Sequence, residues 1–303
     1  MIITKIQGGL GNQMFQYACG KNLALKHNQE LKLDISWYID GRPKVDTPRA
    51  YQLDRFSFAT SADSMIKSAT KKEIGIFSKI SSSRLIKRLL VMFGYAGEKI
   101  SHFVFEPNNI GRYDLDVYEP STYLCGFWQS EKYFEDIIPT IKKDFTSFSD
   151  EMSNKAKEML QKINSSNSVC VNYRRTDYLS NKAAKEYHGV MGDDYYSQAV
   201  KVIVEKIKDP HFFVFSDDIE WCEENVKLGF PTTFITREYS GKEYFDYFRL
   251  MLACKNFIIP NSTFAWWPAW LNTNPDKIVI APKKWFVDMT NRPEIVLSSW
   301  IKI

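Results

Sequence analysis

Two adjacent arginines, Arg174 and Arg175, follow the apolar run of residues 169–173. Asp177 comes two residues later. The apolar run predicts a buried strand, and ligands of open α/β sheets bind at the carboxyl ends of such strands. Because each guanidinium can donate two parallel hydrogen bonds to anionic oxygens, the pair suits a diphosphate. The alternative is a surface salt bridge after an ordinary strand, since charge clusters mark functional sites only statistically.

Polar residues also follow two other apolar segments of the second half. Asp217 comes after residues 212–215, and its carboxylate suits the edge of a guanine base or a metal ion, whereas Asp218 is expected to cap the next helix. Ser262 and Thr263 stand where a further helix is expected to begin. Free N–H groups and a positive dipole end make such a helix start an anion site, with ordinary capping as the alternative.

The glycine-rich turn 8–11 lies between a predicted strand at 2–6 and a predicted helix at 14–27. Strand, glycine turn and helix are typical of the start of a Rossmann-like unit. The turn is not a dinucleotide fingerprint, because the third glycine of the GxGxxG pattern falls at Met14. Asn12 and Gln13 carry amides that suit sugar hydroxyls, and we expect them to bind the acceptor or a sugar.

Strands and helices alternate after a polar tail at 164–167, which is a plausible boundary. Such alternation predicts a parallel sheet covered on both faces, in an α/β fold of two Rossmann-type domains. The expected domains are residues 1–150, with an irregular insert at about 40–120, and residues 151–303. Within the second, the pattern predicts strands near 169–173, 211–216, 232–235, 256–259 and 277–280, and helices near 193–208, 219–226, 243–254 and 262–272.

Composition narrows the class of protein. The net charge of the 303 residues is only +4, which gives no reason to expect a nucleic-acid partner. The five cysteines form no CxxC pair, so we expect no zinc site. The chain shows neither a signal sequence nor an apolar run of about 20 residues, which predicts a cytoplasmic protein. The basic segment 84–93 is either a helix packed on its domain or a peripheral contact with the inner membrane surface.

Four motifs, in their order along the chain, resemble those of glycosyltransferase family 11, which contains α-1,2-fucosyltransferases that use GDP-fucose. They are GGLGNQMFQYA at 8–18, NYRRTD at 172–177, FSDD at 215–218 and NSTFAWWPAWL at 261–271. The segment 280–286 is similar as well. One position departs from the family: Asn172 stands where the family has a histidine. An asparagine still hydrogen-bonds, but it cannot carry a proton or a positive charge.

The resemblance implies a GT-B-like fold, in which two Rossmann-type domains face a cleft, and a metal-independent inverting transfer with no cofactor. GDP-fucose would be held mainly by the C-terminal domain, and a galactose-terminated glycan would accept the sugar. The implied donor contacts are Asn172, Arg174 and Arg175, together with Asp217 at the guanine and Ser262 and Thr263 at the phosphates. Arg174 would also be catalytic, because it faces the charge that develops on the leaving diphosphate.

The residue that takes the acceptor proton is less fixed by the sequence. Asp177 is the first choice for this catalytic base, and the alternative role of Asp177 is to orient Arg175. Glu186, His188, Asp193 and Asp194 are the other candidate bases. Two other functions stay open: a nucleotide-sugar oxidoreductase and a non-catalytic carbohydrate-binding protein. The missing third glycine argues against the former, and the retained arginines argue against the latter.

Overall fold

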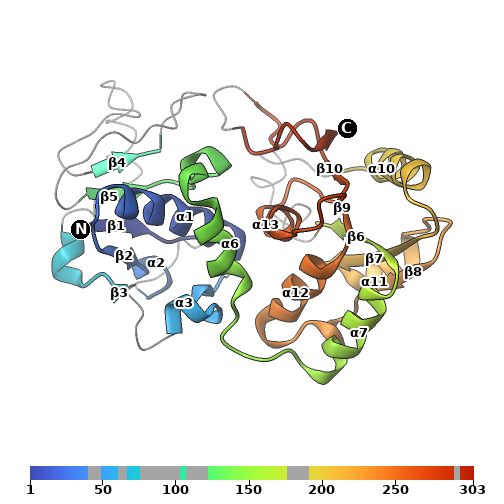
Figure 1. Ribbon diagram of the computed structural model, residues 1–303, viewed down its shortest axis with the longest axis horizontal. Coiled ribbons are helices and arrows are strands. Elements are labelled where there is room, and N and C mark those ends of the chain that lie inside the picture. Colours follow the sequence, from blue (N-terminus) through green and yellow to red (C-terminus); the bar gives the residue numbers. More distant parts are fainter. Residues whose placement is uncertain (40–48, 61–66, 76–102, 107–121, 176–190, 290–293) are drawn as a thin grey trace. The chain divides into compact units, whose positions relative to one another are not determined.

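The computed structural model describes residues 1–39, 49–60, 67–75, 103–106, 122–175, 191–289 and 294–303. The chain divides into two compact units. Unit 1 comprises Met1–Ser149 and Asn291–Ile295, and unit 2 comprises Asp150–Thr290 and Val296–Ile303. Each unit contains a parallel β-sheet with helices packed on it (Figure 1). The α/β class predicted from the sequence is therefore confirmed, whereas the acceptor and donor roles of residues 1–150 and 151–303 stay predictions.

Unit 1 is built on a five-stranded sheet with the strand order β3-β2-β1-β5-β4. Its strands are β1 (Ile2–Lys5), β2 (Leu31–Asp34), β3 (Lys67–Ser68), β4 (Phe103–Phe105) and β5 (Thr122–Cys125). The α-helices within its described residues include α1 (Leu10–Lys26), α2 (Ser36–Ile39), α3 (Ser57–Thr60) and α6 (Ile138–Thr146). Short 3₁₀ helices occur at η1 (Leu53–Arg55), η2 (Glu131–Tyr133) and η3 (Glu135–Ile137). All four residues of the central strand β1 are buried: the apolar Ile2 and Ile3, and the polar Thr4 and Lys5.

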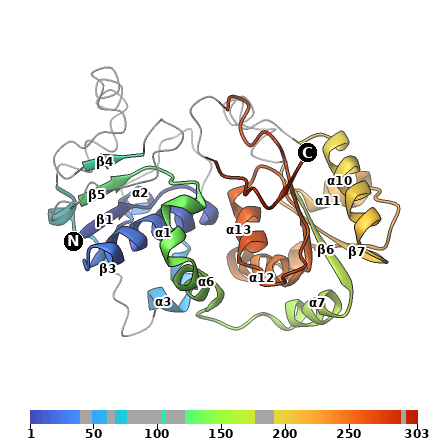
Figure 2. The ribbon, with the colours of Figure 1, turned by 45° about the horizontal axis from the view of Figure 1, so that its top comes forward.

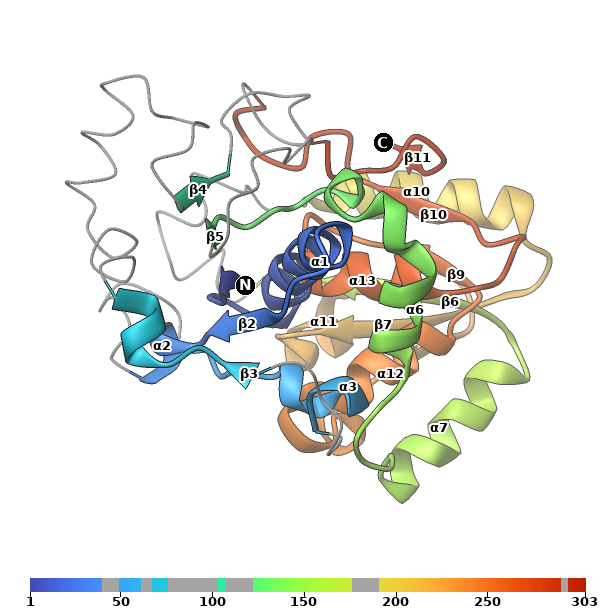
Figure 3. The same cartoon turned by 60° about the vertical axis from the view of Figure 1, so that its left-hand side comes forward.

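Helix α1 begins four residues earlier than the sequence pattern predicts. Of the three glycines of the predicted turn, only Gly8 takes a left-handed conformation, with φ at 82°, and Gly9 is already the extended N-cap residue. The helix then packs against β1 and β2 (Figure 3). The contact is close at Gly20, where a Cβ atom would lie 2.1 Å from the Thr4 hydroxyl oxygen. The predicted turn 8–11 therefore ends at Gly9, and Asn12 and Gln13 belong to the first helical turn.

Unit 2 is built on a six-stranded sheet with the order β11-β10-β9-β6-β7-β8. Its strands are β6 (Asn167–Tyr173), β7 (Pro210–Ser216), β8 (Thr232–Phe234), β9 (Asn256–Ile258), β10 (Val279–Ala281) and β11 (Ile301–Lys302). Its α-helices are α7 (Asn154–Asn164), α10 (Asp193–Lys206), α11 (Ile219–Asn225), α12 (Phe245–Ala253) and α13 (Thr263–Leu271), and its 3₁₀ helices are η4 (Arg237–Tyr239) and η5 (Lys242–Tyr244). The five strands and four helices predicted for this half are confirmed to within three residues at each end.

Helices cover both faces of the unit 2 sheet. Val169 and Val171 of β6 and Phe212 and Val214 of β7 pack against α10 and α11 on one face. Side chains alternate along a strand, so the residues between them point to the other face. There α7 packs against β6 and α12, and α12 packs against α13 (Figure 2). Burial on two faces accounts for the nearly continuous apolar runs that the sequence shows in these strands.

Two predictions for the first half need correction. The sequence pattern predicts a strand from Tyr123 to Trp128 and a helix from Ser130 toward Lys143. In the structure the strand ends at Cys125, and the helix is interrupted. Phe134, with φ at −146°, separates η2 from η3, and Pro139 stands in the first turn of α6, where a proline's missing N–H is no loss. The segment 84–93 and most of the irregular insert 40–120 lie outside the described residues. None of the described helices has the length and apolar character needed to cross a bilayer.

We expect the substitution Arg249→Met to destabilise unit 2 by about 3 kcal/mol, because removal of one partner leaves a buried charge uncompensated. The side chains of Arg249 and Asp246 are 5% and 6% exposed, and Nη1 of the arginine lies 3.3 Å from Oδ1 of the aspartate. The control is Lys157→Met, whose partner Glu151 is exposed. Urea unfolding monitored by tryptophan fluorescence measures the free energy of unfolding of both variants. Equal small losses in the two variants would contradict the stabilising role of the buried pair.

Candidate active site

Arg174 and Asp217 lie side by side at the carboxyl edge of the unit 2 sheet. The strands β6 and β7 are parallel, with Tyr173 opposite Ser216, so the next residue of each strand meets the other. Nη1 of Arg174 lies 3.1 Å from Oδ2 of Asp217, and about a fifth of each side chain is exposed. An arginine carries five N–H donors in a planar fork, so one guanidinium is able to contact a carboxylate and an anionic ligand together.

Asp217 engages both arginines. Its second carboxylate oxygen, Oδ1, accepts the backbone N–H of Arg175 at 2.9 Å. The sequence predicts that this residue contacts a guanine base. Because the geometry engages both of its oxygens within the protein, it favours a different role, in which Asp217 holds the turn after β6 and orients the Arg174 side chain.

Arg175 turns toward helix α11. Its guanidinium carbon lies 3.2 Å from the ring centre of Trp221, and its Nε lies 3.5 Å from Oδ2 of Asp218. The sequence predicts that Asp218 caps α11. The residue does occupy the N-cap position, but its carboxylate makes no capping hydrogen bond and faces Arg175 instead. The two arginines thus contact different groups: Arg174 contacts the carboxylate of Asp217, and Arg175 contacts the carboxylate of Asp218 and the indole ring of Trp221.

Asn172 ties the two central strands together where they end. Its Nδ2 donates to the Phe215 carbonyl at 3.2 Å, and its own carbonyl accepts the Tyr196 hydroxyl at 3.0 Å. Only 7% of the residue is exposed. The hydrogen bond from the Asn172 side chain to the Phe215 carbonyl needs no charged donor. An asparagine is therefore able to join the two strand ends at the position where the family that the sequence resembles has a histidine. A direct donor contact by Asn172 stays a prediction.

Ser262 and Thr263 form the start of helix α13, which follows β9. Strand β9 pairs with β6, so this helix start lies at the same sheet edge as Arg174. Ser262 is the N-cap residue, with φ at −122° and ψ at 119°, but its hydroxyl makes no capping hydrogen bond. The alternative of ordinary side-chain capping is therefore wrong for Ser262. A helix start without a side-chain cap keeps N–H groups of its first turn available to an anion.

The predicted sugar contacts in unit 1 receive different environments. Gln13 is completely buried. Its Nε2 donates to the carbonyls of Gly8 and Ala50 at 3.1 and 2.8 Å, and its Oε1 accepts the N–H of Gln52 at 2.9 Å. Because the side chain has no exposed surface, its assignment as a sugar contact is corrected to a structural role. Asn12 is partly exposed and accepts a hydrogen bond from Gln129, so its sugar contact stays a prediction.

The candidate bases are only partly within the described residues. Asp177, Glu186 and His188 lie outside them. Asp193 and Asp194 are exposed in the first turn of α10, where carboxylates are stabilised by the helix dipole. Among the described residues, no group of three or more His, Cys, Asp or Glu side chains is placed to hold a metal ion. Whether the reaction needs a metal is a separate question, and the expected independence stays a prediction.

Sequence reasoning missed two features of the sheet edges. The first is Trp221, which stacks against Arg175 and lies four residues after Asp217. The helix predicted to begin at Ile219 would have placed this tryptophan in its first turn, close to the sheet edge. Glu106 accepts the N–H groups of Phe127 and Trp128 at 2.7 and 2.9 Å, which fixes the turn after β5. Trp128 is buried there with φ at 55°. No spacing in the sequence indicates this pairing, because the carboxylate comes from another strand.

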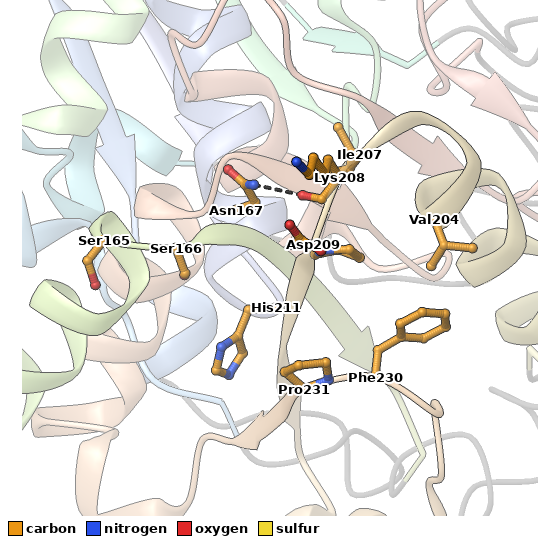
Figure 4. Close-up of a pocket in the computed structure, with 11 residues that line it drawn as sticks. Ser165, Ser166, Asn167, Val204, Ile207, Lys208, Asp209, His211, Phe230 and Pro231 are labelled. Carbon is orange, nitrogen blue, oxygen red and sulfur yellow. Dashed lines mark hydrogen bonds between the residues drawn. The ribbon is translucent and has the colours of Figure 1, made fainter.

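A cavity of about 540 Å³ lies at the other end of the unit 2 sheet. Figure 4 shows its lining residues, with the Asn167 amide donating to the Lys208 carbonyl at 2.7 Å. Asn167 and Pro210 are the first residues of β6 and β7, so the cavity belongs to the amino edge of the sheet. Ligands of parallel α/β sheets bind at the carboxyl edge, where Arg174 lies. The cavity is therefore not part of the candidate active site.

Comparisons with known proteins agree on one family. Residues 112–303 match the model of glycosyl transferase family 11. The Escherichia coli O-antigen biosynthesis glycosyltransferase WbnK is 34% identical over 98% of this chain and 99% of its own length. An α-1,2-colitosyltransferase of the same species is 31% identical over 100% and 99%. The human galactoside α-(1,2)-fucosyltransferase 1 is 27% identical over 62% of this chain and 54% of its own length.

The fold also matches that of solved structures. A crystal structure of the α-1,6-fucosyltransferase NodZ with GDP superposes with a TM-score of 0.54 over 92% of this chain and 94% of that one, at 14% identity. The predicted GT-B-like architecture, with two Rossmann-like units, is thereby confirmed.

We expect Arg174→Ala to weaken the binding of inorganic pyrophosphate by tenfold or more. A charge-assisted hydrogen bond contributes about 1.5–3 kcal/mol, and about 1.4 kcal/mol corresponds to tenfold in affinity. Arg175→Ala should have a smaller effect, because the guanidinium of Arg175 is already engaged by Trp221 and Asp218. Calorimetric titration measures both, with Arg237→Ala as a control at an exposed arginine near the same edge. Equal losses for all three variants would argue against a specific anion site at Arg174.

Proposed function

This chain belongs to glycosyltransferase family 11, and we propose that it transfers L-fucose from GDP-β-L-fucose to the 2-hydroxyl of a terminal β-galactoside, with inversion. The observation that supports the donor most directly is the edge of the unit 2 sheet. There a fixed guanidinium and the start of α13 without a side-chain cap follow neighbouring parallel strands. Both are typical ligands of a diphosphate.

The chemistry follows from where charge develops. When the bond between the fucose anomeric carbon and the β-phosphate oxygen breaks, negative charge accumulates on the departing GDP. Arg174 and the N–H groups of α13 would stabilise that charge without rearranging, because both are held in place before the reaction. Fixed donors aimed at developing charge typically contribute about 3–4 kcal/mol each. Asp217 contributes indirectly, since its carboxylate holds the guanidinium.

The acceptor then completes the reaction. The anomeric carbon becomes oxocarbenium-like, and the galactose 2-hydroxyl attacks from the face opposite GDP. One inversion converts the β-linked donor into an α-1,2-linked product. A carboxylate would take the hydroxyl proton. Asp177 is our first candidate for this base, because it lies three residues after Arg174 in the chain.

The names of the relatives limit the donor and acceptor sugars to a few candidates. The human relative's name gives fucose and a galactoside, and the 31% identical relative of full length transfers colitose by its name. Colitose lacks the 3-hydroxyl of fucose, so a donor site that hydrogen-bonds this group would discriminate strongly between the two sugars. The name of the 34% identical relative places it in O-antigen biosynthesis, which favours a polysaccharide repeat unit as the acceptor here. Family membership favours these transfers over the oxidoreductase and the non-catalytic binding protein.

The direct test incubates the protein with GDP-fucose or GDP-colitose and lactose, in the presence of EDTA. We expect GDP release that depends on the acceptor, a preference for GDP-fucose, and an α-1,2 linkage in the product. Mass spectrometry and linkage analysis measure these outcomes. A preference for GDP-colitose would mean that colitose, and not fucose, is the donor sugar. Loss of activity in EDTA would contradict metal independence, and a linkage other than α-1,2 would contradict the proposed regiochemistry.

We expect Asp177→Asn to lower transfer to lactose by 10²-fold or more, which is the usual contribution of a general base. Hydrolysis of GDP-fucose by water should fall much less, because the departure of GDP does not need the base. Parallel assays of transfer and hydrolysis measure the ratio, with Asp276→Asn as the control at an exposed carboxylate outside the candidate site. If Asp177 instead orients Arg175, both activities will fall equally.

A further inference from the structure

Tyr244 combines exposure with an unfavourable backbone conformation. The residue precedes helix α12, with φ at 65° and ψ at 21°, and 52% of it is exposed. Bulky residues rarely adopt the left-handed region, because Cβ crowds the backbone. Such strain persists only where the surrounding structure imposes it, and it clusters at ligand sites. An exposed aromatic ring in a strained backbone conformation is therefore a candidate ligand contact.

A buried carboxylate lies against the segment that contains Tyr244. Asp246 is 4% exposed, and its Oδ2 accepts the N–H of Ser153 at 3.0 Å, while its Oδ1 faces Arg249. Its own N–H donates to the Ser240 carbonyl at 3.0 Å. Gly241, with φ at 63°, packs so closely that a Cβ atom there would lie 2.3 Å from Oδ2. These contacts fix the backbone of the segment 240–246, and with it the position of the Tyr244 side chain.

The ring of Tyr244 lies at the end of an aromatic series that leads to the donor edge. Its centre is 5.8 Å from that of Tyr247, whose ring meets Phe215 edge-on at 6.0 Å. Phe215 belongs to β7 and lies two residues before Asp217, so the series reaches the carboxyl end of this strand. The hydroxyl of Tyr247 donates to the Ile235 carbonyl at 2.7 Å, which keeps the middle ring in position.

The same end of unit 2 carries the start of α13. Phe248, one helical turn beyond Tyr244, meets Phe264 edge-on with a centre distance of 5.8 Å. Phe264 directly follows Thr263 at the start of α13. The helices α12 and α13 lie side by side in Figures 1 and 2. The first turns of the two helices are therefore neighbours, and α13 follows β9 at the same sheet edge as Arg174.

We infer that Tyr244 is the stacking surface for the guanine base of the donor, an inference that rests on the proposed function. The diphosphate would lie at Arg174 and the start of α13, and the base would extend along the carboxyl edge toward β8. The segment after β8 supplies the exposed ring there. Stacking needs the ring and not the hydroxyl, since every base offers a flat face to an aromatic side chain.

The test compares the binding of GDP and of inorganic pyrophosphate by titration calorimetry. Tyr244→Ala should lose about tenfold in GDP affinity, within the usual range for one base–aromatic stack, and none in pyrophosphate affinity. Tyr244→Phe should bind GDP within about twofold of the wild type, because it keeps the ring. Tyr239→Ala is the control, because this tyrosine lies in the same connection beside Lys155 and Glu238.

Tyr244→Gly separates ligand binding from stability, because glycine adopts the left-handed region without strain. It should be at least as stable as Tyr244→Ala in thermal unfolding and should lose the same GDP affinity. If the wild type binds GDP no better than pyrophosphate, a guanine-nucleotide donor is wrong and the proposed function fails. If the wild type favours GDP and Tyr244→Ala keeps that preference, only the stacking role is overturned.

Discussion

The ion pair between Arg174 and Asp217 is the contact on which the candidate active site depends. It exists because β6 and β7 are parallel and in register, so the first residues after the two strands meet. About a fifth of each side chain is exposed, so the pair is partly buried at the sheet edge. Its consequence is orientation: a long, flexible side chain is held at the sheet edge, so less conformational freedom is lost when an anion binds.

The residues around this ion pair fix different parts of the candidate active site. Asn172 joins the strand ends, Asp217 and Trp221 fix the two arginines, and α13 presents the N–H groups of its first turn. Similar devices shape unit 1, where Gln13 closes the glycine turn from within and Glu106 fixes the turn after β5. In both units a buried polar group fixes backbone whose conformation the local sequence would not specify.

The sequence predicts the elements of unit 2 well, because its strands are buried on both faces and its helices show clear periodicity. It also identifies Arg174, since charge directly after an apolar strand indicates a sheet edge. It misjudges Gln13, because the polarity of an amide does not tell whether its partners are a sugar or the backbone of residues 50–52. It misassigns the Asp218 carboxylate for a similar reason: Arg175 competes with the helix start for the same oxygens. These partners become neighbours only through the fold, so local patterns do not show them.

A crystal structure of the protein with GDP would test the central claim most directly. The bridging diphosphate should lie within hydrogen-bonding distance, about 3 Å, of the Arg174 guanidinium and of the first N–H groups of α13. The Arg174–Asp217 contact should remain in the complex. GDP phosphates bound away from Arg174, or an Arg174 side chain turned away from them, would contradict the donor site and the transfer chemistry derived from it.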